Sequence, residues 1–168
     1  MATATSAASA TPYSDPAMGA KMGELMGGNH AWLFGRRSYE DLLASWNAQG
    51  GPFKDALNNT HKYIASRDAG AVLNWPNSTL LRGDDVQTAV ADLKDRSDAN
   101  LVMMGSGVLI KSLMAADLID QYLLIVAPIV LGTGRRLFCG GLPSCAGANA
   151  TSRRRAPARV LLTYEPAR

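Results

Sequence analysis

Two glycine-containing turns hold the residues of this chain that are best suited to chemistry. An apolar run from Ala31 to Phe34 leads into Gly35-Arg36-Arg37-Ser38, and another from Leu101 to Met104 leads into Gly105-Ser106-Gly107-Val108. Glycine lets the backbone approach an anion closely, and a helix that begins there directs its N–H groups and positive dipole end at the same point. Arginine forks onto phosphate oxygens better than lysine does. Two such turns in one small domain predict a dinucleotide-binding site.

The surrounding sequence predicts strands that alternate with helices. Ser38 is expected to cap the helix after the first turn, because Asp41 follows three residues later and apolar side chains then recur at helical intervals. Further strands are predicted at 61–66 and 79–82, and a helix carries Val86, Val90 and Leu93. Such alternation predicts a largely parallel sheet whose ligands bind at the carboxyl ends of its strands, where Gly35, Ser66 and Gly105 fall.

The length of 168 residues suits one domain with a full core, which we expect to span residues 13–168. Residues 1–12 form an Ala/Thr/Ser tail that is expected to be disordered. A helix is predicted to begin at Asp15-Pro16 and to end at Gly27-Gly28. Residues 139–159 have no apolar period and are expected to be irregular, either as an insert or through a local shift of reading frame.

Charge and composition argue against several classes of protein. The net charge of +3 comes from the end of the chain: residues 1–131 contain ten basic and thirteen acidic residues, whereas residues 132–168 contain seven basic and one acidic. A nucleic-acid groove would need a continuous basic face, so no nucleic-acid partner is expected. Two cysteines and two histidines are too few for a zinc site. No apolar run reaches the length of a membrane span and no secretory signal is evident, so we expect a cytoplasmic protein.

Five motifs, in order, resemble the dihydrofolate reductase-like family, and in particular the RibD C-terminal type of bacterial pyrimidine reductase-like proteins. The resemblance covers about Asp15 to Phe138 and resumes at VLLTYEP near the end of the chain. The motifs are GRRSYE, KYIASR, NSTLLRGD, MMGSG and APIVLGTGRRLF. The second turn fits neither a Rossmann fingerprint nor a P-loop, because the sequence lacks a glycine that each of these motifs requires. Without the resemblance, simple strand-to-helix turns remain the alternative interpretation of these glycines.

The resemblance implies a fold, a cofactor and an activity. The fold would be a three-layer α/β sandwich with a mostly parallel central sheet and helices on both faces. The activity would be NADPH-dependent reduction of a pyrimidine-, pterin- or related heterocycle, most concretely 5-amino-6-(5-phosphoribosylamino)uracil in riboflavin biosynthesis. Asp15 is the candidate proton donor, with a helix cap as its alternative role. Relatives in this family often form homodimers.

The resemblance also assigns the cofactor-binding residues. In the family, the glycine turns and the basic residues after the strands hold NADPH. Arginine and hydroxyl groups suit a 2′-phosphate, whereas NADH would call for a carboxylate. The alternative is a non-catalytic nucleotide-binding member, because the strand with which relatives begin is not recognisable before Asp15. The implied residues are Gly35, Arg36, Arg37 and Ser38 for the phosphates, Ser66 and Arg67 for the 2′-phosphate, and Gly105, Ser106, Gly107 and Val108 for the pyrophosphate.

Overall fold

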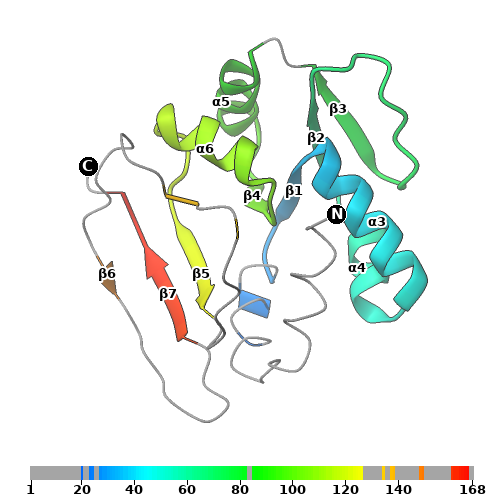
Figure 1. The fold of residues 1–168 in the computed structure, drawn as a ribbon, viewed down its shortest axis with the longest axis horizontal. Coiled ribbons are helices and arrows are strands. Elements are labelled where there is room, and N and C mark those ends of the chain that lie inside the picture. Colours follow the sequence, from blue (N-terminus) through cyan, green and yellow to red (C-terminus); the bar gives the residue numbers. More distant parts are fainter. Residues whose placement is uncertain are drawn as a thin grey trace. The chain divides into compact units, whose positions relative to one another are not determined.

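The fold is described from a computed structural model of the chain (Figure 1). The structure describes residues 20, 23–24, 27–82, 85–126, 134, 137–138, 148–149 and 160–166. These residues belong to two compact units, one formed by residues 23–118 and the other containing the described residues from Ile119 onward. Within the helix predicted from Asp15, the described residues 20, 23 and 24 are helical, and Gly27 and Gly28 lie outside a helix. Asp15 itself, the tail at 1–12 and most of 139–159 lie outside the described residues, and the single domain remains a prediction.

The unit of residues 23–118 is built on a four-stranded parallel sheet. Its strands are β1 (His30–Gly35), β2 (Lys62–Ser66), β3 (Ser78–Arg82) and β4 (Asn100–Met103), in the spatial order β3-β2-β1-β4. All three neighbouring pairs are parallel. Every residue from Ala31 to Gly35 is buried, as expected for a strand in the middle of a sheet that is covered on both faces.

Among the described residues, the helices that follow the strands of this sheet are α3 (Arg36–Gln49), α4 (Pro52–Asn59), α5 (Val86–Arg96) and α6 (Gly107–Ala115). The chain moves from β1 to β2 through α3 and α4, and it returns across the sheet from β3 to β4 through α5. Because crossovers between parallel strands are right-handed, these opposite movements place α3 and α4 on one face and α5 on the other. Two hydrogen bonds from Gln87 Nε2 to Ser112, on its carbonyl and hydroxyl oxygens, join α5 to α6. The α/β sandwich expected from the sequence is therefore confirmed.

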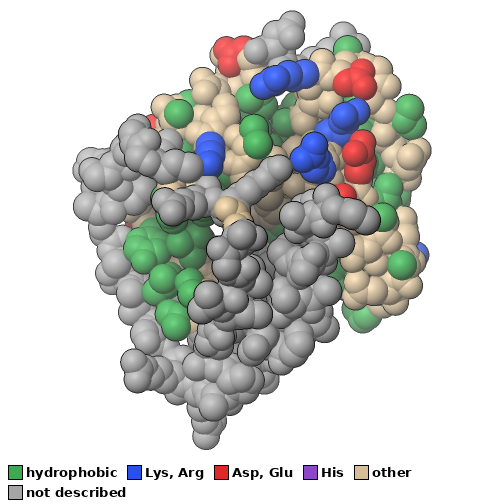
Figure 2. All heavy atoms as spheres, in the orientation of Figure 1, with side chains coloured by type: hydrophobic (Ala, Val, Ile, Leu, Met, Phe, Trp, Pro, Cys, Tyr) green, Lys and Arg blue, Asp and Glu red, His purple; other side chains and the backbone are tan. Residues whose placement is uncertain are grey.

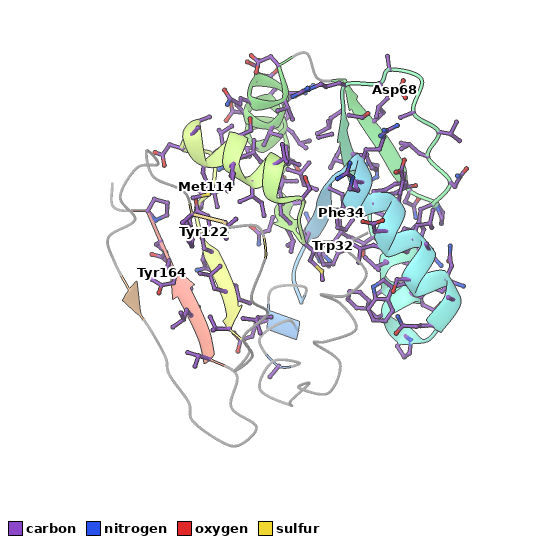
Figure 3. The ribbon with its side chains drawn as sticks, viewed as in Figure 1. Trp32, Phe34, Asp68, Met114, Tyr122 and Tyr164 are labelled. Carbon is purple, nitrogen blue, oxygen red and sulfur yellow. The ribbon has the colours of Figure 1, made fainter. Side chains whose placement is uncertain are left out.

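The main apolar cluster lies where α3 and α4 pack on the sheet. Trp32 and Phe34 are two residues apart on β1 and so project to the same face, where their rings stack with centroids 5.6 Å apart (Figure 3). Aromatic packing of this kind explains why Trp75 is buried, so core packing rather than a pocket accounts for it. The buried members of the cluster are Trp32, Phe34, Tyr39, Leu57, Ile64 and Trp75.

The second unit contains a small antiparallel sheet of β5 (Tyr122–Val126), β6 (Ala148–Asn149) and β7 (Val160–Tyr164), in the order β5-β7-β6. Tyr122 pairs with Tyr164 at one end of β5, and Val126 pairs with Val160 at the other. This pairing brings together two apolar segments that the sequence separates by the patternless stretch. Within the described part of the chain, no helix is long and apolar enough to cross a membrane.

The beginning of α3 differs from the prediction. The helix starts at Arg36, with Gly35 as its N-cap and no side-chain hydrogen bond at the cap, so Ser38 does not cap it. The physical reason is that Gly35 is the last residue of β1 and its extended backbone passes directly into the helix. Ser38 consequently lies within the first turn, where its hydroxyl is available for another neighbour.

Candidate functional site

The candidate site lies at the edge of the sheet where the parallel strands end. Gly35 and Ser66 are the last residues of β1 and β2, and Gly105 follows the end of β4 by two residues. From β1 the chain turns to α3 on one face of the sheet, and from β4 it turns to α6, which is hydrogen-bonded to α5 of the other face. Neighbouring strands whose connections leave to opposite faces form the crevice in which open α/β sheets bind ligands.

The two glycine turns touch each other at this crevice. A Cβ atom added to Gly35 would lie 2.8 Å from Ser106 Oγ, and one added to Gly105 would lie 3.1 Å from Ser38 Oγ. Gly105 also has a φ angle of 85°, a conformation that favours glycine. The structure thus brings together four residues that the sequence predicted for one site: Gly35, Ser38, Gly105 and Ser106.

Two helices begin at these turns. Ser106 caps α6, because its Oγ accepts the backbone N–H of Leu109 at 3.4 Å. Gly107 and Val108 form the first turn, and the side chain of Val108 is 66% exposed. The first N–H groups of a helix have no partner within the helix, so α3 and α6 both present donors and a positive dipole end near the turns. This arrangement suits the phosphates of a nucleotide.

Arginines lie at the same edge of the sheet, and carboxylates lie beside one of them. Arg36 at the start of α3 is half exposed and lies 3.5 Å from Asp68, measured from Nη1 to Oδ2. It also lies 3.8 Å from Glu40 one turn along the helix. Arg37 and Arg67 are exposed. The positive charge of the site is therefore partly compensated by carboxylates, which Figure 2 shows as red side chains among blue ones on this face.

Asp68 is the site residue that sequence reasoning missed. Its Oδ1 accepts the N–H of Gly70 at 3.0 Å, and its own N–H donates to Ser66 Oγ at 3.1 Å. The loop after β2 is thus folded so that the carboxylate turns back toward α3. The signal was present in the sequence, because an acidic residue just beyond the second strand of a dinucleotide-binding fold is a known position for ribose recognition.

The proposed proton donor, Asp15, lies outside the described residues, so its relation to the turns stays a prediction. Among the described residues, no three His, Cys, Asp or Glu side chains are grouped so that they could hold a metal ion.

The family model for the RibD C-terminal domain matches residues 1–154, which include both turns and all of the described sheet of the first unit. The chain belongs to the RibD C-terminal domain family. Members of the family are generally reductases, and the neighbouring turns at the strand edge are the part of the fold that a nucleotide cofactor would use.

The chain is also similar to a curated protein and to a solved structure. The uncharacterized protein YyaP of Bacillus subtilis (strain 168) is 28% identical over 112 residues, which are 63% of this chain and 57% of YyaP. The chain therefore spans little more than half the length of this curated relative. The solved structure is the crystal structure of a protein from Shewanella sp. PV-4 that is named for riboflavin biosynthesis. Its sequence is 24% identical to this chain. It superposes with a TM-score of 0.66 over 93% of this chain and 82% of its own, which shows the shared fold.

Proposed function

We propose that the protein is an NADPH-dependent reductase that transfers hydride to a pyrimidine-, pterin- or related heterocycle. The observation that carries this proposal is the contact between the turns at Gly35 and Gly105, in the crevice between β1 and β4. Because Gly35 and Gly105 let the two turns pack closely against Ser106 and Ser38, the N-termini of α3 and α6 lie near each other, where their N–H groups suit phosphates. The family assignment supports NADPH as the ligand, because RibD C-terminal domains typically bind it.

Different residues at the crevice would bind different parts of the cofactor. The turn at Gly105, Ser106, Gly107 and Val108 would offer backbone N–H groups to the pyrophosphate. Arg36, Arg37 and Ser38 would neutralise and hydrogen-bond its oxygens, because guanidinium groups form paired bonds with phosphate. Ser66 and Arg67 would meet the adenosine 2′-phosphate at the end of β2. Bound there, NADPH would supply a hydride to a carbon of the substrate.

The substrate class is proposed on the family and on the name of the Shewanella relative. The most concrete candidate is 5-amino-6-(5-phosphoribosylamino)uracil, whose reduction belongs to riboflavin biosynthesis. Asp15 would deliver or position the proton that accompanies the hydride. If so, Asp15→Asn should lower kcat by about a hundredfold or more while the affinity for NADPH stays unchanged.

A titration of the protein with NADPH, in which binding is monitored by the fluorescence of the cofactor, tests the proposal directly. NADH serves as the second ligand, and Arg36→Ala and Arg67→Ala are the informative variants. Arg96→Ala is the matched control, because Arg96 lies at the end of α5, which leads to the start of β4 rather than to its carboxyl end. We expect micromolar binding that favours NADPH, weakens at least tenfold in the first two variants and is unchanged in the control.

Two results would contradict the proposal in different ways. A folded protein that binds neither cofactor would show that the turns are only structural. A protein that binds NADPH but oxidises it with none of the heterocycles would favour a non-catalytic nucleotide-binding role for the same site.

A further inference from the structure

The loop after β2 places a carboxylate among the arginines of the candidate site. Asp68 lies 3.5 Å from Arg36, and the two side chains are 56% and 50% exposed. The backbone of the loop fixes the position of Asp68 independently of Arg36, through the hydrogen bond from Gly70 and the one to Ser66. Figure 3 shows Asp68 in the connection between β2 and β3.

The neighbours of Asp68 are the residues proposed to read the adenosine end of the cofactor. Ser66 and Arg67 immediately precede it, and the Ser66 hydroxyl oxygen already accepts the N–H of Asp68. A carboxylate at this position accepts hydrogen bonds from the hydroxyl groups of an adenosine ribose, but it repels a 2′-phosphate. It also compensates the charge of Arg36, which a phosphate would otherwise use in full. Because an exposed ion pair is weak, a phosphate can still displace it.

We propose that Asp68 reduces the preference of this site for NADPH over NADH. This inference rests on the proposed function, since it concerns the same nucleotide crevice. Asp68 weakens the binding of a 2′-phosphate beside Ser66 and Arg67 by its own negative charge, and it supports a 2′-hydroxyl by accepting a hydrogen bond. The protein therefore uses both cofactors, with NADPH only moderately preferred.

The test compares the dissociation constants for NADPH and NADH at low ionic strength in three proteins. These are the wild type and the single variants Asp68→Asn and Glu40→Gln. Asp68→Asn keeps the oxygen that accepts the Gly70 N–H but removes the charge. Glu40→Gln is the matched control, because it removes the other carboxylate near Arg36 while leaving the end of β2 unchanged. We expect Asp68→Asn to raise the ratio of NADPH to NADH affinity by about fivefold, and Glu40→Gln to leave that ratio unchanged.

A second pair of probes isolates the adenosine end. Adenosine 2′,5′-bisphosphate and adenosine 5′-monophosphate compete with the bound cofactor, and only the first contains the 2′-phosphate. Asp68→Asn should strengthen competition by the bisphosphate and not by the monophosphate. The difference should persist when Arg36→Ala is added, because Arg36 is assigned to the phosphates that both cofactors share; its loss there would overturn a direct role of Asp68 at the 2′ position.

The outcomes separate the two proposals. If the wild-type protein binds the cofactors but Asp68→Asn leaves their ratio unchanged, the role of Asp68 is wrong and the proposed function stands. An equal change of ratio in Glu40→Gln would also overturn it, because the effect would then be general electrostatics. If the folded wild-type protein, checked by circular dichroism, binds neither cofactor, both proposals fall.

Discussion

Lys62 is fully buried in β2, although lysine is rarely buried without a charged partner. Its Nζ donates to the carbonyl oxygens of Leu57 and Thr60, which lie at the end of α4, and it lies 5.8 Å from the ring centroid of Trp75. A cation at a helix C-terminus is stabilised by the helix dipole and by exposed carbonyl groups. Burial nevertheless lowers the pKa of Lys62 from 10.5 to about 8.

This pKa predicts a pH dependence of stability with a defined sign. Between pH 8 and 10.5 the unfolded chain binds a proton at Lys62 that the folded chain has already released. The free energy of unfolding should therefore rise with pH across this window, by roughly 3 kcal/mol at most, and the contribution should be constant below pH 8. Denaturant titrations at a series of pH values would measure the slope.

Lys62→Met supplies the control for this slope. The variant leaves the carbonyl groups of Leu57 and Thr60 without their donor, so its absolute stability is not the diagnostic quantity. Its stability should simply lack the rise between pH 8 and 10.5. Equal slopes in the two proteins would show that Lys62 titrates normally in the folded state.

Individual residues were the hardest part of this chain to predict from its sequence. The positions of Gly35, Ser66 and Gly105 at strand ends followed from the apolar runs that precede them, and the structure confirms them. The pairing of Arg36 with Asp68 depends on how the start of α3 and the loop after β2, which lie far apart in the sequence, come together, and no periodicity encodes this. The burial of Lys62 likewise depends on where α4 ends.

At the scale of elements, the two turns act as a pair because β1 and β4 are neighbours. Gly35 has Ser106 against it, and Ser106 in turn caps α6. A methyl group at Gly35 would therefore press on the residue that starts the other helix. Either Ser106, which caps α6, or Gly35, which ends β1, would have to move.

Gly35→Ala should accordingly lower the free energy of unfolding by about 1–3 kcal/mol, the usual cost of overpacking a close contact. Part of this loss should return when Ser106→Gly is added, because the second change removes the hydroxyl that lies 2.8 Å from the new methyl group. A double-mutant cycle measured by thermal or denaturant unfolding gives the coupling between the two positions. Strict additivity would mean that the two turns are not in contact.

Gly107→Ala is the matched stability control for this cycle. A Cβ atom at Gly107 would meet no heavy atom within 4 Å, and the residue is already helical. Its free energy of unfolding should change little or rise slightly, since alanine favours the helix.

Elements were predicted better than their ends. The strands and helices of residues 30–126 follow the alternation of apolar runs with amphipathic segments, and Asp85 caps α5 where the sequence placed the start of that helix. The start of α3 was wrong, because a capping-box spacing at Ser38 competed with a glycine that ends the preceding strand. The geometry of Gly35 prevailed over the side-chain signal.

At the scale of the whole molecule, we expect the purified protein to be a homodimer. Ile125 and Val126 on β5 are 41% and 48% exposed, and among the described residues β5 pairs with β7 on one side only. An apolar strand at a sheet edge is a natural surface for association. Static light scattering across a range of concentrations would measure the mass, and a monomer at every concentration would contradict the expectation.

The fold class was accessible from the sequence because the motifs and the apolar alternation agree from Ala31 to Met103. Glycine and arginine at strand ends predict phosphate binding as a class of chemistry, and that chemistry stays a prediction. The substrate was not accessible from the sequence, since it depends on side chains that converge from distant segments.

The connection between β2 and β3 contains no helix, and its two ends are held in different ways. Tyr39 anchors the later part, since its hydroxyl accepts the N–H of the buried Trp75 at 2.7 Å. The earlier part, residues 67–70, is exposed throughout. Substitutions near Asp68 can therefore accumulate at little cost to folding, so that the proposed preference between NADPH and NADH can change in the descendants of this protein while the sheet stays the same.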